Sequence, residues 1–204
     1  NPDDLDPAYI RAAKLLLGSG ITPALSQSCE ATLRRAVEIA KEAGIPFVFD
    51  PNLRLKLWPA ERARTTLLEF VRQADILLPG ADEAEFLTGE PDPLAAARRL
   101  QAMGPKLVIV KTGAQGALVV DGDESYPVPG FPVERVVDPV GAGDAFMAGF
   151  LAGRLQGKSV YDAVRMANAC GALTTMVPGD IEGIPGRDEI DRLLEAKGGP
   201  DVGR

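Results

Sequence analysis

Short apolar runs that alternate with amphipathic segments over residues 14–110 constrain the fold of this chain more than any other feature. In the amphipathic segments the apolar residues recur at three- and four-residue intervals, which is the spacing of one helix face. Strands that alternate with helices call for a parallel sheet with helices covering its faces. We therefore predict an α/β fold with a mostly parallel central sheet flanked by helices. The predicted strands are Lys14–Gly18, Phe47–Phe49, Ile76–Leu78 and Leu107–Val110, and the predicted helices span residues 3–13, 23–43, 59–73, 81–87 and 92–103.

The second half of the chain begins with a different pattern. Two short strands, Ala117–Val120 and Glu124–Val128, flank the turn sequence Asp121-Gly122-Asp123 and predict a small antiparallel meander. Helices are predicted at residues 141–156, 159–176 and 187–196, followed by a flexible tail at 197–204. The sequence has no internal repeat and no linker, so we predict one domain over residues 1–196.

Charge and cysteine content limit the partners and the compartment. The formal net charge is −7 and no basic block is present, which argues against nucleic acid or an anionic membrane surface as a partner. No apolar run reaches membrane-spanning length. Cys29 and Cys170 are far apart in sequence and lie in helix-like segments, so we expect reduced thiols and a cytoplasmic location.

The chain contains no histidine, which excludes several kinds of chemistry within it. Ser-His-Asp and Cys-His catalysis, and zinc sites that use imidazole, are not available. Proton transfer near neutral pH must fall to a carboxylate, a lysine, a tyrosine or a cysteine.

The stretch Val136–Leu155 reads as a strand, a tight glycine turn and the start of a helix. The first amides of a helix lack intrahelical partners and lie at the positive end of its dipole. Gly141 and Gly143 have no Cβ to keep an anion away, so the turn is a candidate anion hole. Asp144 lies beside it, either as a cap and dipole partner or as a catalytic carboxylate.

Polar clusters follow several of the predicted strands, and ligands of open α/β sheets bind beyond the carboxyl ends of the strands. Ordinary turn chemistry could explain each cluster taken singly. Together they predict one site on one edge of the sheet. The clusters are Asp50–Arg54, Pro79–Glu83, Lys111–Gly116 and Asp138–Asp144.

The sequence GAGD at 141–144, with Asp138 before it and AGFLAG after it, resembles the carboxyl-terminal signature of the ribokinase-like (PfkB-type) carbohydrate kinases. The resemblance covers the chain from about Leu15 to Leu194. It implies the ribokinase-like fold, with residues 1–196 as its carboxyl-terminal two thirds. The amino-terminal strands, the lid and much of the dimer contact would then lie outside this sequence. The resemblance also implies that full-length members are homo-oligomers and that this fragment alone is inactive.

By this resemblance Asp144 would be the base that takes a proton from a sugar hydroxyl as it attacks the γ-phosphate of ATP. The amides of Gly141, Ala142 and Gly143 would stabilise the charge on the transferring group.

The resemblance also implies residues for the nucleotide and for cations. Glu83 would help to organise Mg²⁺ and the phosphates, although Gly80 stands where the family often has asparagine. Asp138 would bind a monovalent cation, K⁺ in some relatives. Asn168 would lie beside the base or the ribose, whereas by itself it reads equally well as an exposed helix residue. The other nucleotide residues would be Lys111, Thr112, Gly113 and Gly116.

The sequence leaves more than one candidate for the identity of the sugar substrate. The stretch Asp50–Trp58 resembles both 2-keto-3-deoxygluconate kinases and fructokinases, and other segments resemble the first group more. Arg54 could read a sugar-acid carboxylate in bidentate fashion, or it could form a surface salt bridge. Asn52 and Asp180 would also contact the sugar, although Asp180 could equally cap a turn. We predict phosphorylation of 2-keto-3-deoxygluconate to its 6-phosphate, with a fructokinase or an inactive binding fragment as alternatives.

Overall fold

The computed structural model describes residues 1–179 and 181–196. These residues form two compact units. Unit 1 comprises residues 1–111 and 118–126, and unit 2 comprises residues 112–117 and the described residues from 127 onward. The assignment of residues 1–196 to one kinase domain stays a prediction.

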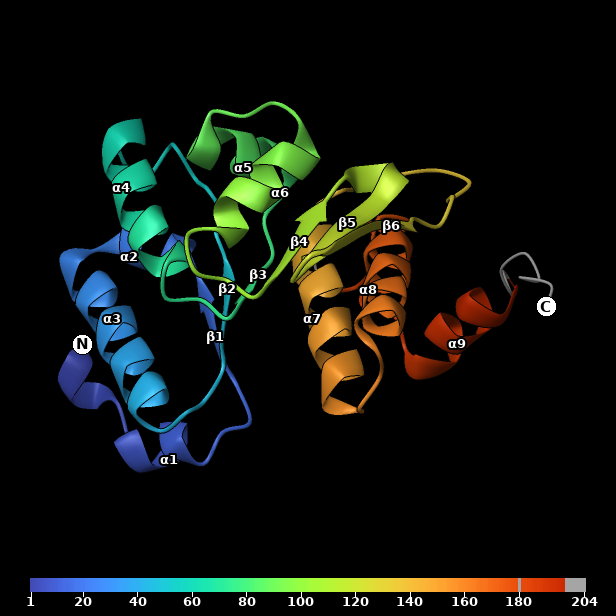
Figure 1. The fold of residues 1–204 in the computed structure, drawn as a ribbon. Helices are drawn as coiled ribbons and strands as arrows, with labels where there is room; N and C mark the ends of the chain where they lie inside the picture. Colours follow the sequence, from blue (N-terminus) through green and yellow to red (C-terminus); the bar gives the residue numbers. More distant parts are fainter. Residues whose placement is uncertain (180, 197–204) are drawn as a thin grey trace. The chain divides into compact units, whose positions relative to one another are not determined.

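Six strands form one sheet in the order β1-β2-β3-β4-β5-β6 (Figure 1). The first four strands are parallel, with Leu16 opposite Phe47 and Leu77 opposite Val108, which confirms the predicted parallel sheet. β5 and β6 are joined by the two residues Gly122 and Asp123, as the predicted meander requires. The strands are β1 (Leu16–Ser19), β2 (Phe47–Asp50), β3 (Ile76–Leu77), β4 (Leu107–Lys111), β5 (Gly116–Asp121) and β6 (Glu124–Pro129).

The helices of unit 1 differ from the prediction at two places. Residues 3–13 form two short helices because Asp6, which precedes a proline, is extended and caps the second one. Residues 23–43 also divide, since Ser26 is extended and its hydroxyl accepts from the Cys29 amide at 3.0 Å. The elements are η1 (Pro2–Asp4), α1 (Pro7–Arg11), α2 (Ile21–Leu25), α3 (Gln27–Glu42), α4 (Ala60–Val71), α5 (Ala81–Thr88) and α6 (Pro93–Gln101).

The core of unit 1 lies where helices pack on β2, β3 and β4. Phe49 stacks against Phe47 and Phe70 with ring centroids 5.7 and 5.5 Å apart, and all three side chains are fully buried. Leu33 and Val37 of α3 and Leu100 of α6 belong to the same cluster. The polar loops therefore begin at the carboxyl ends of buried strands.

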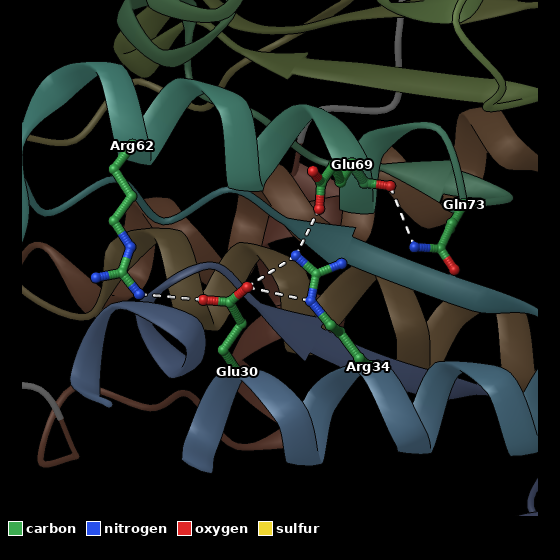
Figure 2. A network of polar contacts seen from close by, with 5 residues as sticks. All are labelled: Glu30, Arg34, Arg62, Glu69 and Gln73. Carbon is green, nitrogen blue, oxygen red and sulfur yellow. Dashed lines mark hydrogen bonds and ion pairs between the residues drawn. The ribbon is translucent and has the colours of Figure 1, made fainter. Parts of the chain in front are cut away.

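A polar network joins α3 to α4 in unit 1 (Figure 2). The guanidinium of Arg34 donates to Glu30 of its own helix and to Glu69 of α4, while Arg62 of α4 donates back to Glu30. Arg34 also lies over the ring of Phe70 at 5.2 Å from its centroid. The network orients the two helices over the aromatic core.

Unit 2 contains η2 (Gly113–Gln115), α7 (Ala142–Leu155), α8 (Val160–Thr174) and α9 (Arg187–Ala196). α7 and α8 lie side by side (Figure 1). A Cβ added at Gly149 would lie 2.7 Å from the sulfur of Cys170, so the glycine is needed for this close approach. Among the helices that the structure describes, none combines the length and apolar character needed to cross a membrane.

The strand predicted at Val136–Val137 is wrong, since this segment is irregular. The amides of Val137 and Asp138 both donate to the carbonyl of Thr175, at 2.8 and 3.1 Å. These two donors are therefore used at the end of α8 and are not available for pairing with a neighbouring strand.

Candidate functional site

The glycine turn before α7 presents backbone amides at the start of a helix. Gly141 adopts a left-handed conformation with φ 78° and caps α7. The amide of Ala142 donates to Pro139 at 3.3 Å, whereas those of Gly141, Gly143 and Asp144 have no acceptor among the described residues. The positive end of the α7 dipole therefore carries free donors, as an anion site requires.

Asp144 is the third residue of α7 and is exposed. Its carboxylate accepts no hydrogen bond and forms no ion pair with any described residue, and the Gly141 amide does not donate to it. A capping role would require such a bond. The side chain is therefore available to a ligand at the same helix end.

A cavity of about 430 Å³ adjoins this turn within unit 2. It is lined by residues of α7 and α8 and by residues of the segment from Ile181 to Ile190, and Asp144 is the one charged residue among the described ones that line it. The thiol of Cys170 also faces the cavity, and burial raises its pKa to about 11. This thiol stays protonated at neutral pH, which leaves Asp144 as the candidate base.

Asp138 ties two loops of unit 2 together. One carboxylate oxygen accepts from the Val140 amide at 3.0 Å and the other accepts from the Gly179 amide at 3.2 Å. These backbone hydrogen bonds hold the pKa of Asp138 below its usual value. Over residues 1–179 and 181–196 there is no cluster of three histidine, cysteine, aspartate or glutamate side chains suited to a metal ion. The monovalent cation at Asp138 stays a prediction.

The turn from Thr112 to Gly116 contains two glycines that serve different purposes. A Cβ at Gly116 would lie 2.2 Å from the carbonyl oxygen of Val128, so this glycine is required by packing. Gly113 has φ 61°, is exposed and faces open space. No packing contact therefore requires a glycine here, and the contact of Gly113 with a nucleotide stays a prediction.

Asn168 is buried in α8 and is not the exposed helix residue that the sequence alone could suggest. Its amide nitrogen donates to the carbonyls of Val128 and Pro129, at 3.0 and 3.1 Å. These bonds fix the end of β6 against α8. Its contact with a nucleotide stays a prediction.

In unit 1 the carboxyl ends of β2 and β4 carry an ion pair. The ammonium group of Lys111 lies 2.7 Å from a carboxylate oxygen of Asp50. Burial raises the pKa of Asp50, while the charge of Lys111 opposes this rise. Lys111, predicted to contact the nucleotide, thus forms an ion pair with Asp50, a member of a predicted cluster to which the sequence analysis assigned no role of its own. Opposite charges at the ends of strands in one sheet are the signal that could have found the pair.

Glu83 uses both carboxylate oxygens on backbone amides. One accepts from the amide of Gly80, the N-cap of α5, at 2.7 Å, and the other accepts from Leu53 at 2.8 Å. Asn52, just before Leu53, has φ 40°, a left-handed conformation that asparagine tolerates better than most residues. Glu83 therefore supports the loop predicted to bind the sugar.

The side chain of Arg54 is exposed and donates to the carbonyl of Leu53 at 3.0 Å. It forms no ion pair with any described carboxylate, so the alternative of a surface salt bridge is not observed. The guanidinium can still receive an acid group. Asp180, the other predicted sugar contact, lies outside the described residues.

The four predicted loops divide between the units. Asp50–Arg54, Pro79–Glu83 and Lys111 belong to unit 1, while the turn after Lys111 and the Asp138–Asp144 loop belong to unit 2. Within unit 1 the first two loops and Lys111 are brought together by the contacts above. That all four loops form one site stays a prediction.

Comparison with known families places most of the chain in one of them. The model for pfkB family carbohydrate kinases matches residues 2–187. A 2-dehydro-3-deoxygluconokinase of Bacillus subtilis is 38% identical over 190 residues, which is 93% of this chain and 59% of that protein. Fructokinase-1 of Zea mays is 38% identical over 205 residues, which is 95% of this chain and 62% of that protein. The chain thus spans about three fifths of the length of these relatives.

Two solved structures of similar proteins have the same fold as this chain. A putative ribokinase II from E. coli in complex with ATP and Mg²⁺ has a TM-score of 0.88 and 31% identity, covering 96% of this chain and 63% of that one. A fructokinase from Vibrio cholerae O395 in its fructose, ADP and calcium ion bound form has a TM-score of 0.82 and 29% identity, covering 93% and 64%. The parallel sheet with its antiparallel part is therefore of the ribokinase-like kind.

Proposed function

Since this chain belongs to the pfkB family of carbohydrate kinases, we propose that it phosphorylates a sugar acid with ATP, converting 2-keto-3-deoxygluconate to its 6-phosphate. The start of α7 carries the proposal. There the amides of Gly141, Gly143 and Asp144 and the Asp144 carboxylate lie within one helical turn and have no partner among the described residues. Such a turn offers both an anion site and a base, the two groups that phosphoryl transfer needs from a protein.

Asp144 accepts the proton of the attacking hydroxyl in the proposed reaction. The sugar oxygen forms a bond to the γ-phosphorus as the bond from that phosphorus to the bridging oxygen breaks, and ADP leaves. The free amides at the start of α7 donate hydrogen bonds to the charge that develops on the transferring group.

The nucleotide would approach the turn at Thr112 and Gly113. Gly113 is exposed, whereas the Thr112 amide already donates to the Gly116 carbonyl at 2.9 Å. Mg²⁺ fits this chain as an ion held chiefly by ATP phosphates, because no described cluster of carboxylates could hold it alone. Glu83 is the carboxylate that would face it, although both of its oxygens already accept amides. When bound, the ion supplies positive charge that neutralises the phosphates.

Arg54 supports a sugar acid over a neutral ketose. Its side chain is exposed, its guanidinium donates to the Leu53 carbonyl at 3.0 Å, and it has no described carboxylate partner. A planar guanidinium binds a carboxylate through two parallel hydrogen bonds, and fructose has no such group. Phosphorylation of fructose is the second candidate, because a fructokinase is as similar to this chain as the 2-dehydro-3-deoxygluconokinase is.

The test compares 2-keto-3-deoxygluconate with fructose in a coupled ADP-release assay, using the gene product as the cell makes it. The Arg54→Ala variant should raise KM for the sugar acid about 10- to 100-fold, the loss of a bond between charged groups, and should leave KM for fructose nearly unchanged. Lys56→Ala is the matched control, since Lys56 is an exposed cation of the same loop. An equal rise of KM for both sugars in Arg54→Ala would refute the binding of a sugar carboxylate by Arg54. The absence of ADP release with either sugar would refute the kinase proposal.

A further inference from the structure

Asp50 and Lys111 form a largely buried ion pair at the carboxyl ends of β2 and β4. The two side chains retain 4% and 18% of their exposure, and they meet across the intervening strand β3. The Lys111 backbone is fixed as well, since its amide donates to Pro79 at 2.8 Å. Removal of either partner would leave a buried charge without compensation.

The second oxygen of Asp50 holds the loop that follows β2. It accepts from the Asn52 amide at 3.1 Å, and the next amide, of Leu53, donates to Glu83 at 2.8 Å. Asn52 is the one non-glycine residue at positive φ among the described residues. Two carboxylates thus hold two consecutive amides at the point where the backbone takes a costly conformation.

The charge of Lys111 favours the ionised form of Asp50 beside a second carboxylate, that of Glu83. The charge of Glu83 and the burial of Asp50 both disfavour the ionised form of Asp50. Lys111 opposes both effects through its contact at 2.7 Å. Without it, Asp50 would be a weaker acceptor for the Asn52 amide, because hydrogen bonds to ionised groups are stronger than neutral ones.

We propose that Asp50 and Lys111 are a positioning pair for the segment Asn52–Arg54. The backbone that they fix sets where the Arg54 guanidinium meets its ligand, and the identity of that ligand as a sugar acid rests on the proposed function. Lys111 then acts on the sugar side of the reaction and not as a nucleotide contact.

Amide hydrogen exchange tests the pair without any substrate. In Lys111→Met the Asn52 and Leu53 amides should exchange about tenfold faster or more, the loss expected for hydrogen bonds to charged groups. Lys111→Arg should retain their protection. Lys106→Met, which changes an exposed lysine immediately before β4, is the matched control and should leave both rates unchanged. Wild-type exchange of both amides in Lys111→Met would overturn the proposal.

A double variant keeps the test decisive if Lys111→Met does not fold. Asp50→Asn with Lys111→Met removes both buried charges but keeps an oxygen that can accept from the Asn52 amide. It should fold and still exchange faster at Asn52 than the wild type. Unchanged exchange in this variant would show that the charges do not matter.

Kinetics then separate the sugar side from the nucleotide side. Lys111→Met, or the double variant in its place, should raise KM for the sugar acid about tenfold and change KM for ATP by less than about twofold. A raised KM for ATP with an unchanged sugar KM would assign Lys111 to the nucleotide and overturn the proposal. If the wild type phosphorylates neither sugar, the proposed function fails, and amide exchange still decides the role of the pair.

Discussion

Replacement of Asp144 by asparagine distinguishes the two roles that a carboxylate can play in the first turn of a helix. As a dipole partner, Asp144 would contribute about 0.3–1 kcal/mol to stability. In a chain of 204 residues this corresponds to a melting temperature lowered by about 1–4 °C. As the base, it would contribute a factor of about 10²–10⁴ in rate. That factor equals about 2.7–5.5 kcal/mol in the activation barrier, several times the stability term.

The structure indicates that Asp144→Asn changes only the charge of one side chain and disturbs no described contact. Asparagine has nearly the same size, the carboxylate has no described partner to lose, and the amides of Gly141 and Gly143 are unchanged. We therefore expect Asp144→Asn to keep its fold and its affinity for ATP while kcat falls about 10²–10⁴-fold. Asp162→Asn is the matched control, because Asp162 is the third residue of α8 and is exposed.

Three measurements decide the matter: kcat by coupled ADP release, ATP affinity by calorimetry, and the melting temperature of each variant. Asp162→Asn should lower the melting temperature slightly, since the Ser159 hydroxyl then donates to an uncharged oxygen, and should keep the wild-type kcat. The reasoning would be refuted if Asp144→Asn turned over within about threefold of the wild-type rate. It would also be refuted if both variants lost activity equally.

Two further predictions concern stability. Phe70→Ala removes a fully buried ring that packs on Phe49 and lies under the Arg34 guanidinium. The free energy of unfolding, measured in urea, should therefore fall by about 3–5 kcal/mol. A fall of less than about 1 kcal/mol would contradict the assigned packing. Backbone hydrogen bonds lower the pKa of Asp138, so its carboxylate stabilises the folded state above about pH 4, and this stabilisation is lost as the pH falls through the lowered folded-state pKa. The difference in melting temperature between wild type and Asp138→Asn should therefore narrow from pH 7 to pH 3, and a constant difference would count against the assignment.

Much of the fold could be predicted because the signals are local. Four parallel strands follow from the apolar runs, and the start of α7 follows from the glycines before it. Local chemistry that the prediction overlooked explains the misplaced helix boundaries. Asp6-Pro7 and Ser26 are ordinary helix-start signals that divide what periodicity alone joined. The strand predicted at Val136–Val137 is absent although both residues favour strands. The amides of Val137 and Asp138 instead donate to the Thr175 carbonyl at the end of α8, so β propensity did not decide the structure here.

The candidate site was less predictable than the fold. The type and position of Asp144 were visible in the sequence, but only the folded chain shows that its carboxylate has no partner among the described residues. Glu83 and Lys111 were selected as ligand contacts, and in the structure each is bound to another part of unit 1. Charge and spacing mark a residue as chemically capable, but they do not say whether another group already uses that capacity.

The sequence by itself determined the class of sheet, the absence of imidazole chemistry and the helix start that offers amides beside a carboxylate, because each depends on composition or on neighbours within a few residues. The tertiary structure alone decided the partners of the charged side chains. Lys111 meets Asp50, Glu83 meets Leu53 and Asp138 meets Gly179. Each of these pairs joins residues at least 30 positions apart. Such contacts arise only when the sheet and its loops have formed. Among them, burial at the ends of β2 and β4 makes Asp50 and Lys111 partners of each other.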